Sequence, residues 1–312
     1  MSAARWQVGF FAWARRQGYR ARTLKNFVTH ARVFEEFLEE RGVDHPCDGT
    51  RELIADFQAY LMTFVCRRHR PYSTSARGQI LSWLKKLYGF FIDDGRILTD
   101  PTRGLRLPRV GRRLPRSVLT AAEMRRLLVA PDTTTPAGLR DRAILELLYG
   151  TGLRFSELAD LTVGDLDLVE KILWVRHGKG DKDRVLPLGR WAAYWLARHL
   201  DVSAVERRRR RSERVFLAPR AERLSSEIVC LWLQAHAAQA GLTKPITTHT
   251  LRHTFATVLV KGGADIRKVQ KLLGHNQLTS TQIYTHLDLT DLRRVQQQCH
   301  PREKRRGAVR RG

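Results

Sequence analysis

Residues 247–256 read TTHTLRHTFA, which places Arg252 between His249 and His253. On a helix, residues four apart share a face, and so do residues three apart. His249 and His253 are therefore spaced like a pair of zinc ligands, whereas His249 and Arg252 are spaced to hold one phosphate between them. The stretch alone is compatible with both kinds of site, and the rest of the chain has to discriminate between them.

The zinc interpretation lacks the other residues that such a site normally contains. A catalytic His-x-x-x-His pair normally has a glutamate beside the first histidine and a third ligand downstream. Here the neighbour of His249 is Thr250, and Arg252 brings positive charge to the place that a dication would occupy. His275 is available as a third ligand, but nothing supplies the general base. We therefore favour the phosphate interpretation and expect no metal.

The composition points to a polyanionic partner. The 312-residue chain has 56 Lys and Arg against 31 Asp and Glu, a formal net charge of +25. Such an excess is typical of nucleic-acid binding, although a generally basic surface without this partner is the alternative. The four cysteines form no C-x-x-C pair, and no apolar run reaches the length of a membrane span. We expect a reduced, cytoplasmic protein that does not associate with membranes.

Helical periodicity and turn residues divide the chain into two domains. In residues 1–104, apolar side chains recur at helical spacing and predict a small helical bundle, with stretches at 6–16, 24–38, 54–65 and 80–91. Residues 105–117, LRLPRVGRRLPRS, contain five arginines with prolines and a glycine, which predicts an extended basic linker. Residues 118–312 predict a mostly helical domain with one small antiparallel sheet. The expected fold class is therefore mainly α.

The second domain begins at a capping box, Thr120–Glu123, which opens a helix over 124–129. Two short β-like runs, 172–175 and 184–188, are joined by HGKGDKD, whose glycines predict a hairpin with Lys179 at its tip. Further helices are expected at 137–149, 190–200, 226–240, 248–261 and 265–273.

Two arginine-rich segments are candidates for DNA contact. Arg112, Arg113 and Arg116 lie in the linker, which has the composition expected of a segment that crosses a phosphate surface. Arg207 to Arg211 lie in a predicted loop. For the linker an ordinary solvated connector is the alternative interpretation. For Arg207 to Arg211 the solvated surface is the favoured interpretation and DNA contact the alternative, because runs of like charge are usually solvated.

Six polar residues of the second domain together suit phosphoryl transfer without a metal: Arg154, Lys179, His249, Arg252, His275 and Tyr284. Taken singly, each has an ordinary interpretation as a surface, hairpin-tip or capping residue. As a set, guanidinium groups match the non-bridging oxygens of a phosphodiester, and a lysine can protonate a leaving alkoxide. Histidines hydrogen-bond the phosphate or manage a proton, and a tyrosine becomes nucleophilic when cationic neighbours favour its phenolate.

Four motifs carry a resemblance to a known family in their order and spacing: TGLRFSEL (151–158), HGKGDKDRVLPL (177–188), HTLRHTFAT (249–257) and LLGHNQLTSTQIYTHL (272–287). Together they resemble the tyrosine recombinase, or phage integrase, family, and most closely the bacterial Xer recombinases. The ending QQQCHPRE (296–303) is similar to the Xer C-terminus. Residues 1–104 resemble the family's core-binding domain, through SARGQILSWLKKLYGFFIDDGRILTDP in particular, so 118–312 would be the catalytic domain with a basic C-terminal tail.

The resemblance implies a catalytic role for each residue of the set. Tyr284 would be the nucleophile that forms a 3′-phosphotyrosyl link to one DNA strand. Arg154 and Arg252 would hold the scissile phosphate, and Lys179 would be the general acid for the 5′-hydroxyl.

The remaining residues of the set would assist this chemistry. His249 and His275 would act at the phosphate, and Glu157, in Arg-x-Ser-Glu, matches an acidic position that supports the site. Members of the family use neither a metal nor a nucleotide, so no cofactor is expected. Phe155 is bulkier than the small aliphatic residue expected at its position, and it lies outside the catalytic set.

The resemblance implies a site-specific DNA recombinase that resolves chromosome or plasmid dimers as a tetramer on two double-stranded DNA sites. Its expected partners are the recombination site, a second recombinase and an FtsK-type translocase, with the protein in the cytoplasm at the nucleoid. The C-terminal helix, DLRRVQQQC, would dock onto a neighbouring subunit.

Three other functions are open alternatives. A mobile-element integrase or resolvase of the same family has the same catalytic residues. A catalytically inactive DNA-binding accessory protein is disfavoured by the complete set of six, and a type IB topoisomerase by the helical first domain and the hairpin spacing.

Overall fold

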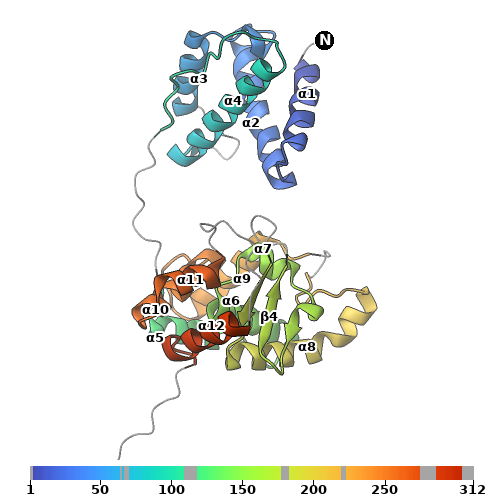
Figure 1. Ribbon diagram of the computed structural model, residues 1–312, viewed down its shortest axis with the longest axis vertical. Coiled ribbons are helices and arrows are strands. Elements are labelled where there is room, and N and C mark those ends of the chain that lie inside the picture. The colour runs from blue at the N-terminus through green and yellow to red at the C-terminus, as the bar shows by residue number, and fades with distance from the viewer. Residues whose placement is uncertain are drawn as a thin grey trace, which may run out of the picture. The chain divides into compact units, whose positions relative to one another are not determined.

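The computed structural model of the chain describes residues 3–63, 65–66, 70–108, 118–176, 183–218, 223–274 and 286–303. The chain forms two compact units, Met1–Arg113 and Leu114–Gly312, and each is described by itself (Figure 1). In the described part of both units, no helix is long and apolar enough to cross a membrane.

The first unit is the predicted helical bundle. Its described elements are α1 (Ala3–Arg16), α2 (Ala21–Glu40), η1 (Pro46–Asp48), α3 (Arg51–Thr63), β1 (Val65–Cys66), β2 (Arg70–Pro71) and α4 (Thr74–Asp93). The four α-helices match the four predicted stretches. The third ends at Thr63 rather than Val65, because Val65 pairs with Pro71 in a short antiparallel ladder.

Aromatic side chains build the core of this bundle, as the periodicity predicts. The fully buried rings include Trp6, Phe10, Phe34, Phe37, Phe57, Trp83, Tyr88 and Phe91. Phe34 and Phe57 meet edge to face, with ring centroids 4.8 Å apart, which is a favoured aromatic geometry. Val28 belongs to the predicted stripe but is exposed on the surface of α2. These rings hold the bundle together and are not available to stack on bases.

The second unit is mostly helical with one small sheet, as predicted. Its described elements are α5 (Ala121–Val129), α6 (Pro136–Thr151), α7 (Phe155–Asp160), η2 (Val163–Asp165), β3 (Leu166–Asp167), β4 (Ile172–Val175), β5 (Arg184–Pro187), α8 (Arg190–Arg210), α9 (Ser226–Gln239), α10 (Thr248–Lys261), α11 (Ile266–Leu273) and α12 (His286–Cys299). The predicted capping box of α5 is present: Glu123 N donates to Thr120 Oγ1, and Thr120 N donates to the Glu123 carboxylate.

Helix α6 is the centre of the second unit. It packs against α8 on one side and α10 on the other, and Figure 1 shows it among the surrounding elements. Because it is enclosed, almost all of its residues are buried, including the charged Arg142 and Glu146. These two residues form a salt bridge, which offsets part of the desolvation of the charges.

The sheet is antiparallel, in the order β3-β4-β5. Strands β4 and β5 are the two predicted runs, and Val175 pairs with Arg184 at the end where they are joined. The connecting hairpin predicted for HGKGDKD lies outside the described residues, except for Asp183. The short strand β3 was not predicted, since two residues are too few to create an alternating pattern.

The prediction of a loop at Arg207–Arg211 is wrong. Helix α8 continues to Arg210, and Arg211 caps it in the left-handed conformation with φ 49°. Glu206 accepts hydrogen bonds from both Arg209 and Arg210, and Arg207 donates back to the carbonyl of Leu200. Arginine is a good helix former, and these contacts offset the repulsion within the run.

The described part of the C-terminal segment, up to Glu303, packs on its own unit. The side chain of Gln296, on α12, donates to the carbonyl of Gly150, and His300 Nε2 donates to the carbonyl of Tyr149. Arg302 pairs with Glu146. In this single chain the C-terminal segment contacts its own unit, and its docking onto a neighbouring subunit, which the family resemblance implies, stays a prediction.

Candidate active site

The TGLR motif forms a tight turn between α6 and α7. Gly152 ends α6 with φ 66°, and its N–H donates to Leu148 O at 2.9 Å. A Cβ at this position would lie 2.4 Å from the ring of Phe255, so glycine is required by both the backbone and the packing. The turn places Arg154 at the N-cap of α7.

Glu157 fixes Arg154 from the first turn of α7. Arg154 Nη1 donates to Glu157 Oε1 at 2.9 Å, and Arg154 N donates to Glu157 Oε2 at 2.8 Å. The carboxylate therefore caps the helix and orients the guanidinium at the same time. Glu157, the predicted supporting residue, thus contacts Arg154, one of the two arginines predicted to hold the phosphate.

Arg252 reaches the same place from α10. Its side chain is buried, and Nη1 donates to Gly152 O while Nη2 donates to Leu273 O, each at 2.6 Å. Arg154 Nη2 donates to the next carbonyl along, that of Gly274, at 2.8 Å. The turn after α6 and the end of α11 therefore hold both arginines.

Arg184 belongs to this cluster and was missed in the sequence. It is 4% exposed, and its Nη1 and Nη2 donate to the two oxygens of Glu157 at 2.9 and 2.7 Å. A signal was available in the strand pattern: Arg184 and Leu186 share a face of β5, and Leu186 belongs to the apolar core. An arginine on the apolar face of a strand predicts a buried acidic partner.

The cluster is cationic. Although burial alone raises the pKa of Glu157, hydrogen bonds and charge from Arg184 and Arg154 lower it to about 2. Burial and the charge of Arg154 lower the pKa of Arg252 to about 10, so it stays protonated at neutral pH. Three guanidinium groups thus surround one carboxylate, and an anion bound there would reduce their mutual repulsion.

The two histidines that open the sequence analysis lie on α10. Thr247 caps this helix, and both His249, in its first turn, and His253 are exposed. Arg252 is buried beneath that surface. Among the described residues, no group of three or more His, Cys, Asp or Glu side chains is arranged to hold a metal ion.

The remaining predicted site residues lie outside the described residues. They are Lys179, His275 and Tyr284 of the proposed catalytic set and Arg112, Arg113 and Arg116 of the linker. The structure therefore brings together Arg154, Glu157 and Arg252, with His249 on the helix that carries Arg252. An arrangement of fixed guanidinium groups on a rigid scaffold binds a phosphate and stabilises negative charge that develops on it.

Residues 117–290 match the model of the phage integrase family. The chain belongs to this family. It is a tyrosine-type site-specific DNA recombinase with an Xer-like function, which confirms the resemblance in the four motifs.

Individual relatives cover nearly the whole recombinase. It is 37% identical to tyrosine recombinase XerC 2 of Ralstonia nicotianae, over 94% of this chain and 84% of the relative. It is 38% identical to tyrosine recombinase XerD of Pseudomonas putida, over 92% of this chain and 93% of the relative. The fold is similar to that of lambda integrase, solved as a tetramer bound to a Holliday junction, with a TM-score of 0.65 and 22% identity over 89% of this chain and 78% of that one.

Proposed function

We propose that this recombinase cleaves DNA through a covalent link to Tyr284. The phenolate oxygen attacks the scissile phosphorus, a new P–O bond to Tyr284 forms, and the bond from phosphorus to the 5′ oxygen breaks. Lys179 gives the departing 5′ oxygen its proton. Attack by a 5′-hydroxyl of the partner strand reverses the step and releases Tyr284, so neither a metal nor a nucleotide is needed.

The observation that carries the proposal is the convergence of Arg154 and Arg252 on the end of α11, beside Glu157. Two guanidinium groups held by backbone carbonyls are ready to receive the non-bridging oxygens of a phosphate without reorganisation. We assign these two arginines to the scissile phosphate. His249 and His275 assist at the same phosphate.

The two units divide the work of binding DNA. Residues 1–104 bind one part of the duplex as the core-binding domain, 105–117 cross between the domains, and 118–312 carry out the chemistry. Arg112, Arg113 and Arg116 contact DNA phosphates as the linker passes. The net charge of +25 supports binding to a polyanion of this size.

A suicide substrate tests the chemistry. In a duplex nicked just beyond the cleavage position, the short released fragment diffuses away, and the covalent adduct accumulates. Wild-type protein is expected to form an adduct that denaturing electrophoresis detects, and Tyr284→Phe is expected to form none. An adduct with Tyr284→Phe, or none with the wild type, contradicts the proposal.

The biological reaction is proposed to be dimer resolution. Identity to XerC and XerD proteins over most of the chain supports this over insertion of a mobile element, whose enzymes share the catalytic residues. We propose a tetramer on two sites, with a second recombinase and an FtsK-type translocase as partners, acting at the nucleoid in the cytoplasm. Deletion of the gene is expected to leave chromosome or plasmid dimers, whereas a defect in the movement of a cargo element alone would indicate the integrase alternative.

A further inference from the structure

The salt bridge between Arg184 and Glu157 lies outside the six residues assigned to catalysis. We propose that Arg184 is a positioning residue for strand cleavage, which orients Arg154 by holding Glu157 in place. This inference rests on the proposed function, in which Arg154 binds the scissile phosphate. It concerns how that arginine is held, and not whether it acts.

The hydrogen bonds of Glu157 show how Arg184 would orient Arg154. Its Oε1 accepts from Arg154 Nη1 and from Arg184 Nη1, and its Oε2 accepts from Arg154 N and from Arg184 Nη2. The two contacts with Arg154 come from the same short helix as Glu157. Only Arg184 ties the carboxylate to another described element with a two-pronged contact, so it prevents Glu157 and Arg154 from moving together.

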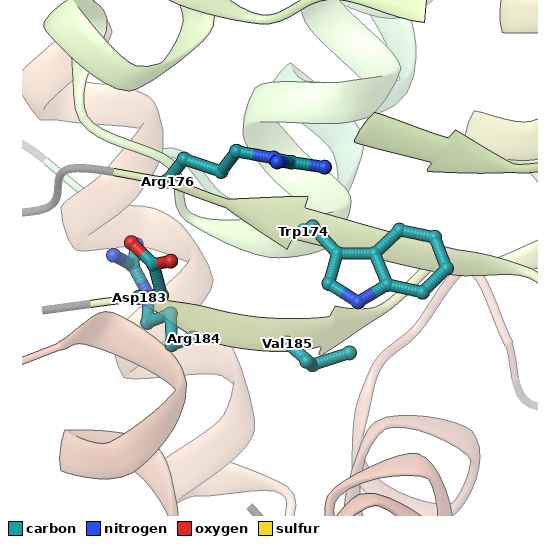
Figure 2. A pocket seen from close by; sticks show the side chains of 5 residues that line it. All are labelled: Trp174, Arg176, Asp183, Arg184 and Val185. Atoms are coloured by element: carbon teal, nitrogen blue, oxygen red, sulfur yellow. The ribbon is translucent and has the colours of Figure 1, made fainter. Parts of the chain in front are cut away.

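Arg184 is well placed to act as the fixed point. It belongs to β5 and pairs with Val175 of β4, so its backbone is part of the sheet. Figure 2 shows Arg184 and Asp183 at one end of β5; with Trp174, Arg176 and Val185 they line a hollow of about 280 Å³. The guanidinium of Arg184 is buried and contacts Glu157 of α7.

A second contact links Arg184 to the other acceptor of Arg154. A Cβ added at Gly274 would lie 3.1 Å from the guanidinium carbon of Arg184, so this group fills the space beside the Gly274 backbone. The carbonyl of Gly274 accepts from Arg154 Nη2. Arg184 therefore supports both groups that orient the Arg154 side chain, the Glu157 carboxylate and the Gly274 carbonyl.

Stability alone does not account for an arginine here. Its Nε is buried without a hydrogen-bond partner among the described residues, and an unpaired buried donor costs free energy. A buried ion pair is also weak evidence for stability, since apolar side chains of similar volume often pack as well or better. The geometry of the pair is better explained by what it orients than by what it stabilises.

The chain offers a matched control. Arg223 pairs with Asp160 at the last residue of α7 through two hydrogen bonds, Nε to Oδ1 at 2.6 Å and Nη2 to Oδ2 at 2.5 Å. Both pairs are two-pronged and involve a carboxylate on α7, but Arg223 binds through Nε and Nη2 rather than through Nη1 and Nη2, and both side chains of its pair are substantially exposed. Arg223→Met removes a surface ion pair, and Arg184→Met removes the buried one.

The first readout separates chemistry from binding. Single-turnover adduct formation on the nicked duplex, with protein saturating, is expected to slow about 10²-fold in Arg184→Met, the effect of a misplaced catalytic group. The dissociation constant for the intact duplex is expected to change little, and Arg223→Met is expected to behave like the wild type. A wild-type rate in Arg184→Met overturns the inference.

The second readout is the pH dependence of adduct formation. The charged groups that face Glu157 are Arg154 on α7, Arg184 on β5 and Arg252 on α10. Removing Arg184 raises the pKa of Glu157, and the protonated acid no longer holds Arg154. The rate in Arg184→Met is therefore expected to fall at a higher pH than the wild-type rate as the solution is acidified, and an unshifted acid limb overturns the inference.

A double substitution tests the route through Glu157. In a Glu157→Gln background, Arg184→Met is expected to cause a smaller loss of rate than in the wild type, because the carboxylate, one of the two groups through which Arg184 supports Arg154, is already gone. If the rate reduction in the double variant equals the product of the reductions in the two single variants, Arg184 acts directly or through the fold, and the inference is overturned.

Two further outcomes remain distinguishable. If the melting temperature of Arg184→Met is well below that of the wild type, Arg184→Lys is measured instead, because lysine keeps the charge without the two-pronged geometry. Slower adduct formation at unchanged DNA affinity then supports the inference, and a wild-type rate overturns it. If wild-type protein forms no adduct at all, the proposed function fails, and Arg184 has no cleavage chemistry to position.

Discussion

Arg154 and Arg252 donate hydrogen bonds to successive carbonyl groups at the end of α11. Arg252 Nη2 lies 2.6 Å from Leu273 O, and Arg154 Nη2 lies 2.8 Å from Gly274 O. Carbonyls at the C-terminus of a helix lack partners within the helix and carry partial negative charge, so they attract guanidinium groups. The end of α11 therefore sets the spacing of the two arginines before DNA binds.

Replacing either arginine with lysine tests whether this fixed geometry matters. Lysine keeps the charge but cannot make two parallel hydrogen bonds, so Arg154→Lys and Arg252→Lys are each expected to slow single-turnover cleavage about 10²–10³-fold. Binding to an uncleaved duplex is expected to change much less. Arg223→Lys is the control, and cleavage at the wild-type rate in Arg154→Lys would contradict the assignment.

Gly152 is expected to be intolerant of substitution for two separate reasons. Its φ is 66° and an added Cβ would meet the Phe255 ring, whereas Gly241 has φ 65° with its nearest neighbour at 3.8 Å. Gly241→Ala should cost about 1–2 kcal/mol from backbone strain alone. Gly152→Ala should cost about 1–3 kcal/mol more, because the ring must move. Urea denaturation measures both, and equal losses would show that the packing is not restrictive.

The linker arginines are expected to contribute to the salt dependence of DNA binding. Each neutralised phosphate makes the slope of log K against log[salt] more negative by about 0.9. Replacing Arg112, Arg113 and Arg116 together with glutamine is expected to make the slope less negative in proportion to the phosphates they contact. Filter binding at several salt concentrations measures the slope, and an unchanged slope would identify the segment as an ordinary solvated connector.

Acidification is expected to destabilise the second unit through His300. Burial lowers the pKa of His300 from 6.5 to about 4, so the folded state binds its proton more weakly than the unfolded state does. The stability linked to this residue is fully present above pH 6.5 and is lost as the pH falls towards 4, by up to about 3 kcal/mol. His300→Phe should flatten this part of a stability-against-pH curve, and an unchanged slope would exclude the contribution.

Much of the architecture followed from local patterns in the sequence. The four helices of the first unit, the capping box of α5 and the two longer strands each have a signal within one stretch of chain, which is periodicity, a cap or alternation. Helix α7 was missed because six residues show no period. Helix α8 extends beyond its predicted end because Glu206 and Leu200 provide partners for the arginines, and a run of like charge carries no periodic signal of these contacts.

The candidate site was only partly predictable. Arg154, Glu157 and Arg252 were found through their motifs, and the structure brings them together. Arg184 was not found, because its importance depends on a contact between a strand and a helix that are separated in the sequence. Long-range pairing of this kind leaves little trace in a local pattern beyond a charged residue on an apolar face.

The central claim is that Tyr284 carries the DNA strand between cleavage and rejoining. The most direct measurement is mass spectrometry of peptides from the adduct that wild-type protein forms on a nicked duplex. The account predicts one modified peptide, with the nucleotide remnant joined through a 3′ phosphate to Tyr284. A remnant on a serine, a histidine or another tyrosine would contradict it.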